Sequence, residues 1–181
     1  GRDKLLEPVA GHPLLRHQTK LALTQTPNVI VTLRDPDPAR RSALASLPIT
    51  VLHVADAATG MSASIRAAAA ITQTALMILP ADMPDLTSDD LAQLIAAFDQ
   101  TSDDILRGSA LGKPGHPVIL PASLLPELCR LQGDEGARSV LQRHAAKVRL
   151  IALPDQHALT DLDTPEDWAR WRQAASNTRA S

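Results

Sequence analysis

One uninterrupted apolar segment, Ala75-Leu76-Met77-Ile78-Leu79, constrains the fold of this chain more than any other segment. Five apolar side chains in a row, without polar alternation, predict a β-strand that is covered on both faces. This segment is the central one of a series of short β-rich segments. The other expected strands are Asn28–Leu33, Ile49–Val54, Asp104–Gly108, Val118–Leu120 and Val148–Leu153.

Helical patterns lie between the expected strands. Thr87 followed by Asp90 resembles a capping box at the start of one of them. Strands that alternate with helices predict βαβ units and a largely parallel sheet, with ligands bound beyond the carboxyl ends of the strands. The expected helices are Leu14–Gln25, Ser62–Thr72, a helix that begins after Thr87, and a last helix announced by Thr164-Pro165-Glu166-Asp167.

Composition narrows the possible partners. The 181 residues are 44% hydrophobic and 21% charged, which is ordinary for a globular protein of one domain. Net charge is −2, basic residues form no patch, and aromatic residues make up only 2% of the chain, so nucleic acid is not expected as a partner. No segment is long and apolar enough to span a membrane, so we expect no membrane partner and a cytoplasmic protein.

A single carboxylate follows the central strand. Asp82 lies between Pro80 and Pro84, two prolines that stiffen the loop beyond the strand. Magnesium prefers oxygen ligands and is usually bound by one or two carboxylates together with substrate phosphates, so Asp82 is a candidate ligand. A second acidic segment contains Asp161 and Asp163. Each aspartate also suits an ordinary turn or helix start, so local spacing leaves both interpretations open.

Other segments are weaker indications when taken alone. Gly60-Met61-Ser62-Ala63-Ser64 combines a flexible glycine with two hydroxyls at a helix start, which suits either a nucleotide loop or a simple cap. Gly112–Pro117 is expected to be a tight turn before a strand, and Gly133–Arg138 is expected to open a helix. Lys4 is an isolated base near the first residue. The six histidines show no zinc-binding spacing.

In their order along the chain, these segments resemble the MobA-like nucleotidyltransferase superfamily. The sequence looks closest to its molybdenum cofactor cytidylyltransferases, which join CMP from CTP to molybdopterin. The matching segments are Gly1-x-x-Lys4-Leu5-Leu6, Gly11-His12-Pro13-Leu14-Leu15, Gly60-Met61-Ser62-Ala63-Ser64, Pro80-Ala81-Asp82-Met83-Pro84, Gly115-His116-Pro117-Val118, Gly133-Asp134-Glu135-Gly136-Ala137-Arg138 and Asp161-Leu162-Asp163-Thr164-Pro165-Glu166-Asp167.

The resemblance implies an α/β fold of the nucleotide-diphospho-sugar transferase type, a Rossmann-like three-layer α/β/α sandwich with a mostly parallel sheet. It also implies roles for individual residues. Lys4 matches the lysine that contacts the NTP phosphates, and Asp82 and Asp163 match the two Mg²⁺ ligands. The Gly60–Ser64 loop has the form that reads cytosine. The implied nucleotide-binding residues are Lys4, Gly60, Met61, Ser62, Ser64, Pro80, Ala81 and Asp82, and the implied acceptor-binding residues are Gly115, His116 and Pro117.

One feature departs from the family pattern. The opening strand and its glycine-rich loop, of the form Leu-Ala-Ala-Gly-x-Ser-x-Arg-Met, do not precede Gly1. Residues 1–181 are therefore expected to form a single nucleotidyltransferase domain that lacks this strand and loop in the sequence as given.

The implied activity is Mg²⁺-dependent transfer of CMP from CTP to the phosphate of molybdopterin, with release of pyrophosphate. A molybdoenzyme that receives the product is a further expected partner. Two other enzymes are alternatives: a guanylyltransferase of the same superfamily, and a cytidylyltransferase that acts on a sugar or isoprenoid-precursor phosphate such as methylerythritol phosphate. A nucleotide-binding cofactor chaperone without catalytic activity is the alternative outside enzymes.

Overall fold

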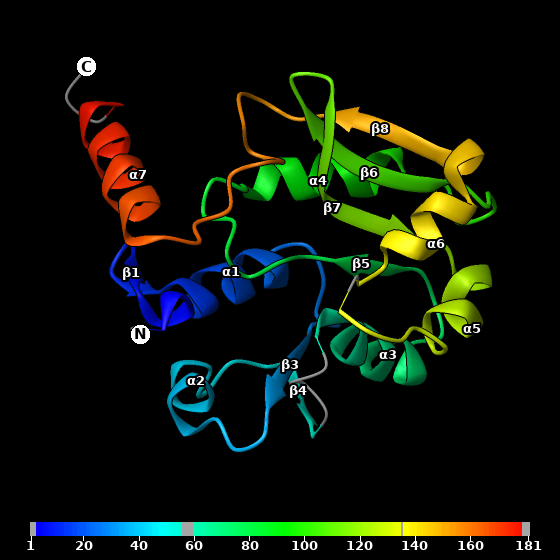
Figure 1. The fold of residues 1–181 in the computed structure, drawn as a ribbon, viewed down its shortest axis with the longest axis horizontal. Helices are drawn as coiled ribbons and strands as arrows, with labels where there is room; N and C mark the ends of the chain where they lie inside the picture. The colour runs from blue at the N-terminus through cyan, green and yellow to red at the C-terminus, as the bar shows by residue number, and fades with distance from the viewer. Residues whose placement is uncertain (1–2, 56–59, 135, 179–181) are drawn as a thin grey trace.

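A computed structural model describes residues 3–55, 60–134 and 136–178 (Figure 1). All six strands expected from the sequence are present, and the continuous apolar segment forms one of them. Five of them begin and end within two residues of the expected positions, and the expected strand Val118–Leu120 begins earlier, at Lys113. The strands are β3 (Ile30–Arg34), β4 (Thr50–Val54), β5 (Leu76–Ile78), β6 (Ile105–Ala110), β7 (Lys113–Leu120) and β8 (Val148–Ala152).

The expectation of a mostly parallel sheet needs a correction at β7. Strands β5, β7, β6 and β8 form a sheet in that order, and β7 is antiparallel to both β5 and β6, whereas β6 and β8 are parallel. Three of the four strands thus point the same way, but only one neighbouring pair is parallel. The reversal follows from a two-residue turn in which Leu111 and Gly112 have φ values of 52° and 75°, because such turns join antiparallel strands.

The same turn corrects the expectation for Gly112–Pro117. Only Leu111 and Gly112 form the turn, and the following residues already belong to β7. The register of β6 against β7 shifts between Arg107, which pairs with Val118, and Ser109, which pairs with Pro114, and this shift marks a bulge in the ladder. A separate parallel pair, β3 and β4, lies below the larger sheet in Figure 1.

Helices cover both faces of the four-stranded sheet. One core cluster joins Ile65 of α3 (Met61–Ile71), Leu128 of α5 (Leu125–Leu128) and Val140 of α6 (Arg138–Arg143) to the strands. The second joins Leu94 of α4 (Ser88–Ala97) to the opposite face. On β5, Leu76 and Ile78 pack on the first cluster and Met77 on the second, so the strand is covered on both faces as expected. The helices are α1 (Leu14–Leu23), α2 (Pro38–Ala43), α3 (Met61–Ile71), α4 (Ser88–Ala97), α5 (Leu125–Leu128), α6 (Arg138–Arg143) and α7 (Pro165–Thr178).

Helix α7 packs on the beginning of the chain, on the left in Figure 1. Trp168, which is 5% exposed, forms a core cluster with Val9, Leu14 and Leu162. The Trp168 and Trp171 rings meet edge to face with centroids 6.0 Å apart, so these tryptophans pack against each other. Within the described residues, no helix has the length and apolar character needed to cross a bilayer.

Candidate active site

Three residues that the sequence singled out meet at one point. The Lys4 Nζ atom donates a hydrogen bond to Asp82 Oδ2 at 2.7 Å and another to Asp163 Oδ1. The two aspartates are 78 and 159 positions from Lys4 along the chain. Because both carboxylates reach the same ammonium group, their oxygens lie within about two hydrogen-bond lengths of each other.

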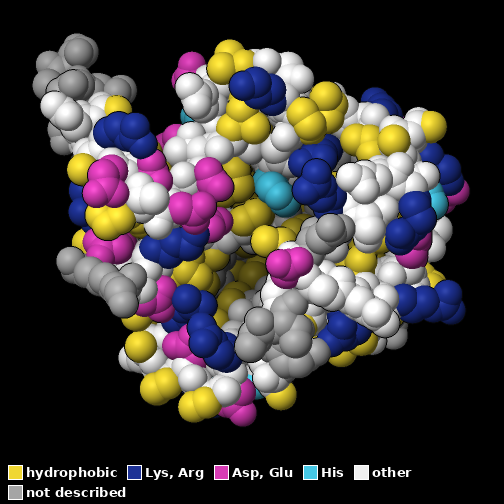
Figure 2. Space-filling model, in the orientation of Figure 1, with side chains coloured by type: hydrophobic (Ala, Val, Ile, Leu, Met, Phe, Trp, Pro, Cys, Tyr) yellow, Lys and Arg dark blue, Asp and Glu magenta, His cyan; other side chains and the backbone are white. Residues whose placement is uncertain are grey.

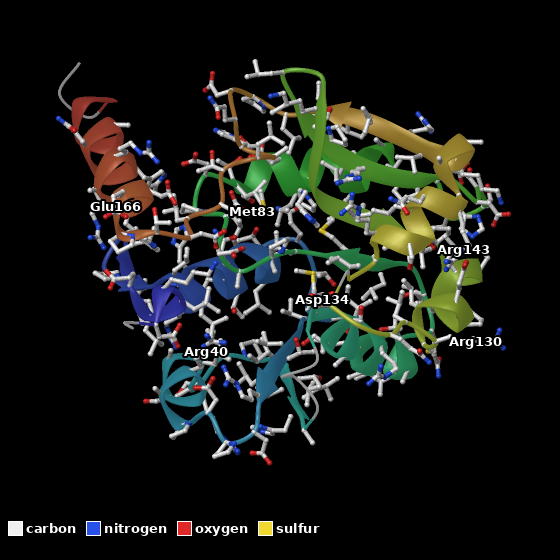
Figure 3. All side chains as sticks on the ribbon, viewed as in Figure 1. Arg40, Met83, Arg130, Asp134, Arg143 and Glu166 are labelled. Atoms are coloured by element: carbon white, nitrogen blue, oxygen red, sulfur yellow. The ribbon has the colours of Figure 1, made fainter. Side chains whose placement is uncertain are left out.

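A short 3₁₀ helix, η1 (Lys4–Leu6), places Lys4 at this point. Asp3 caps the helix by accepting a hydrogen bond from the Leu5 backbone N–H at 3.0 Å. The Arg40 guanidinium of α2 donates two hydrogen bonds to the Asp3 carboxylate, at 2.8 and 3.0 Å, and Figure 3 labels Arg40 on that helix. These bonds lower the pKa of Asp3 despite its partial burial. The Asp3–Arg40 pair thus fixes the helix that carries Lys4.

Asp82 extends from the loop that follows β5. Its backbone carbonyl accepts a hydrogen bond from the Leu162 N–H at 3.2 Å, which joins this loop to the segment before α7. The next carbonyl, that of Met83, accepts a hydrogen bond from the buried Gln18 side chain of α1 at 2.8 Å. Asp82 therefore stands on a backbone held from two directions, while its side chain keeps 25% of its surface exposed.

Asp163 lies on the segment between β8 and α7, and two contacts hold this segment, one to α4 and one to β7. His157 Nδ1 lies 2.8 Å from Oδ2 of the buried Asp90, the residue that also closes the α4 capping box with Thr87. The carbonyl of Ala158 accepts a hydrogen bond from the His116 N–H of β7 at 2.9 Å. Sequence reasoning missed the His157–Asp90 pair, because 67 residues separate the two side chains.

A further set of hydrogen bonds follows Asp163, at the start of α7. The Thr164 N–H donates to Asp167 Oδ2 at 2.9 Å, and the Asp167 N–H donates to the Thr164 hydroxyl at 3.1 Å. These reciprocal bonds confirm the helix start expected at Thr164. The Thr164 hydroxyl, which donates a hydrogen bond to Asp167 Oδ2 at 2.6 Å, lowers the pKa of Asp167 to about 2, together with the Thr164 N–H and the Arg170 guanidinium. Asp163, with 65% of its side chain exposed, thus precedes a well-defined helix terminus.

Two carboxylates and one ammonium group meet at this point. Burial opposes protonation of Lys4, but its hydrogen bonds with Asp163 and Asp82 outweigh burial and raise the pKa of Lys4. Among the described residues, no group of three or more His, Cys, Asp or Glu side chains converges in a way that would enclose a metal. Two partly exposed carboxylates fit Mg²⁺, which commonly takes one or two protein carboxylates and completes its shell with phosphates and water.

The predicted nucleotide loop lies at the start of α3. Gly60 has φ 106°, and a Cβ atom there would stand 2.4 Å from the Asp134 Cα, so only glycine fits. Figure 3 labels Asp134 beside this helix end. Ser62 is fully buried and its hydroxyl donates to the Gly136 carbonyl at 3.4 Å, so this side chain joins two loops. The N–H groups in the first turn of α3 have no intrahelical partner, as at the start of any α-helix, and the N-cap residue Gly60 has no side chain that could cap them.

The three predicted acceptor residues belong to β7. Gly115 and Pro117 are buried, so His116 is the one that presents a partly exposed side chain. Burial and the nearby Arg107 guanidinium lower the pKa of His116, while Asp82 and Asp161 act in the opposite direction. His116 is therefore neutral near pH 7 and lies within electrostatic reach of Asp82. Of the predicted segments, Gly1 and Glu135 lie outside the described residues.

Comparison with known proteins supports the family that the sequence resembles. Residues 1–148 match the model of the MobA-like NTP transferase domain. The purine catabolism protein PucB of Bacillus subtilis strain 168 is 32% identical over 117 residues, which are 64% of this chain and 56% of that protein. The molybdenum cofactor cytidylyltransferase of Escherichia coli strain K12 is 27% identical over 123 residues, 66% of this chain and 60% of that protein. The matched regions thus span little more than half of these relatives.

Solved structures agree on the fold. Rv0371c of Mycobacterium tuberculosis H37Rv is 25% identical, with a TM-score of 0.81 over 96% of this chain and 90% of that one. A structure of Rv0371c in complex with manganese has a TM-score of 0.76, 25% identity, and coverage of 94% and 91%. These matches confirm the α/β fold, and the manganese complex shows a divalent metal bound to a protein of similar fold.

Proposed function

The chain belongs to the MobA-like NTP transferase family, and on this basis we propose that it transfers CMP from CTP to a phosphate of molybdopterin, with Mg²⁺ as cofactor. The observation that carries the proposal is the convergence of Lys4, Asp82 and Asp163. The name of the Escherichia coli relative supports CTP as the nucleotide and molybdopterin as the acceptor.

The reaction needs positioning and charge neutralisation more than a covalent intermediate. An oxygen of the acceptor phosphate attacks the α-phosphorus of CTP, a new P–O bond forms, and the bond to the pyrophosphate oxygen breaks. The attacking phosphate is already ionised at pH 7, so no side chain has to remove a proton. The leaving pyrophosphate carries the displaced electron pair, and the ammonium group of Lys4 would stabilise its negative charge.

Asp82 and Asp163 are the residues that would hold Mg²⁺. When bound, the ion would supply positive charge to phosphate oxygens as negative charge develops in the transition state. The backbone contact between Asp82 and Leu162 fixes the relative position of the two loops that carry the carboxylates. Gly60, Met61 and the first turn of α3 would bind cytosine through backbone N–H groups. The buried Ser62 hydroxyl would hold this loop in place through Gly136, and Ser64 would complete the loop. Pro80 and Ala81 would shape the nucleotide side of Asp82.

CTP with Mg²⁺ is expected to raise the melting temperature of the protein by about 5 °C at a concentration a hundred times its dissociation constant. GTP at the same concentration should raise it by less, because the Gly60–Ser64 loop has the cytidine form. Differential scanning fluorimetry with each nucleotide, with Mg²⁺ or EDTA, measures the effect. Equal shifts for the two nucleotides, or a larger shift with GTP, would refute the assignment of the loop.

Pyrophosphate release identifies the acceptor. Molybdopterin with CTP is expected to give turnover, whereas methylerythritol phosphate with CTP and molybdopterin with GTP should give little. Turnover only with methylerythritol phosphate, or only with GTP, would assign the chain to one of the other two transferase activities. Tight CTP binding without pyrophosphate release from any acceptor would instead favour a nucleotide-binding chaperone. The expected downstream partner is a molybdoenzyme that receives the product in the cytoplasm.

A further inference from the structure

Helix α7 contacts the chain close to each of the three residues that meet at the candidate active site. The helix begins at Pro165, directly after the segment that carries Asp163. It also contacts the segment that carries Lys4 and the loop that carries Asp82. Figure 2 shows acidic and basic side chains close together on the side of the molecule where α7 lies. The family model matches residues 1–148, so α7 lies beyond the matched region.

The contact with the Lys4 segment is an ion pair. Arg172 Nη2 donates a hydrogen bond to Oε2 of Glu7 at 2.7 Å, and Glu7 is only 8% exposed. Glu7 is the C-cap residue of the 3₁₀ helix that begins at Lys4. The Arg172 guanidinium also lies over the Trp168 ring, 5.0 Å from its centroid. A buried carboxylate and an aromatic ring thus fix α7 against the beginning of the chain.

The contact with the Asp82 loop is a hydrogen bond from a tryptophan. Trp171 Nε1 donates to Asp85 Oδ1 at 2.6 Å, and both residues are partly buried. Among the described residues, no other group donates a hydrogen bond to the Asp85 carboxylate. Asp85 belongs to the same loop as Asp82, and Pro84 lies between them and restricts the backbone. A displacement of Asp85 would therefore reach Asp82 through a short and stiff segment.

The other tryptophan of α7 makes no such hydrogen bond. The Nε1 atom of Trp168 is buried and, within the described part of the chain, has no hydrogen-bond partner. The Trp168 ring packs with Val9, Leu14 and Leu162. Trp168 therefore contributes apolar packing, whereas Trp171 also contributes an oriented donor to the loop of the active site.

We propose that Trp171 is a positioning residue of the transferase, which holds the loop of Asp82 where this carboxylate meets Asp163. The proposal rests on the metal site proposed above. A group that fixes the support of a metal-binding side chain affects metal affinity, because a displaced carboxylate binds the ion more weakly. The hydrogen bond from the Leu162 N–H to the Asp82 carbonyl reports whether the loop is in place, and it does so without metal.

Calorimetric titration of Trp171→Phe with Mn²⁺ is the first test. Phenylalanine keeps an apolar ring and removes the N–H donor, so the dissociation constant for Mn²⁺ should rise by about threefold to tenfold. A loss of folded protein would instead lower the number of binding sites and leave the dissociation constant unchanged. Asp85→Leu should have the same effect as Trp171→Phe. Asp85→Asn, which keeps a carbonyl oxygen for the tryptophan N–H, should retain most of the affinity.

Amide hydrogen exchange without metal is the second test. In Trp171→Phe, the Leu162 N–H should exchange faster by about threefold or more, relative to the amides of β6. The matched control is Trp168→Phe, which removes an N–H without a hydrogen-bond partner and should lower stability to urea without changing the dissociation constant for Mn²⁺.

Two results would overturn the proposal. One is an unchanged dissociation constant together with unchanged Leu162 exchange in Trp171→Phe, and the other is an equal loss of Mn²⁺ affinity in Trp168→Phe. If the wild type bound no Mn²⁺, the proposed metal site would fail. The exchange of the Leu162 N–H would then decide by itself whether Trp171 holds the loop.

Discussion

Replacement of Asp82 by alanine is expected to lower kcat/KM for nucleotidyl transfer by about a thousandfold or more, equivalent to about 4 kcal/mol of transition-state stabilisation. Asp82 is the less exposed of the two carboxylates that meet at Lys4, and its backbone is held by Leu162. Loss of its carboxylate would remove a ligand of the proposed Mg²⁺ and leave Asp163 to hold the ion alone. The fold should persist, because the Asp82 backbone contact does not depend on the side chain.

Steady-state pyrophosphate release and calorimetric titration with Mn²⁺ would measure activity and metal affinity of this variant. The matched control is Asp89→Ala, which removes an exposed carboxylate from the first turn of α4 and should leave turnover unchanged. Asp163→Ala should lose activity in the same way. The double variant should be little worse than either single variant, because two ligands of one ion act as a unit. Near-normal turnover in folded Asp82→Ala would remove the metal assignment.

Local patterns in the sequence predicted most of the secondary structure. The apolar run that contains Leu76–Ile78 became β5, and the Thr87–Asp90 pair became a capping box, because both features depend on residues close together in the chain. The short helix α2 was not predicted, although Asp37-Pro38 is a helix-start signal and Asp37 does cap it. Its six residues are too few to show a helical period.

The contacts that hold the site together could not be predicted in the same way. Arg40 reaches Asp3 across 37 residues, and Gln18 reaches the Met83 carbonyl across 65 residues. Neither contact leaves a spacing pattern in the sequence, since each depends on how the elements pack. The convergence of Asp82 and Asp163 was expected only because the order of the segments resembles a known family. Their separate local contexts suit ordinary turns equally well.

Two hydrogen bonds between backbones contribute to the position of Asp163. The segment before α7 is attached to β7 through the hydrogen bond from the His116 N–H to the Ala158 carbonyl, and to the Asp82 loop through the Leu162 N–H. Both hydrogen bonds require the segment to lie close to β7 and to the Asp82 loop. Gly115 permits that approach on β7, because a Cβ atom at this position would stand 1.9 Å from the Ala158 carbonyl oxygen.

Gly115→Ala is therefore expected to lower the free energy of unfolding by about 3 kcal/mol and to reduce transferase activity at the same time. The new methyl group cannot coexist with the Ala158 carbonyl, which belongs to backbone and cannot rotate away as a flexible side chain could. Either β7 or the segment before α7 has to move. A shift of that segment displaces Asp163 from Asp82, so metal affinity should fall together with stability.

Urea unfolding followed by circular dichroism, together with Mn²⁺ titration of the folded variant, would measure both effects. Gly112→Ala is the matched control, because Gly112 has φ 75° and a Cβ atom there would meet nothing within 4 Å. Its cost of about 1 kcal/mol should come from backbone conformation alone and should leave metal affinity unchanged. If Gly115→Ala were as stable as the wild type and bound Mn²⁺ equally well, close packing at Gly115 would not determine where Asp163 lies. A loss of metal affinity in Gly115→Ala that is absent from Gly112→Ala would trace the position of the second carboxylate to this one glycine.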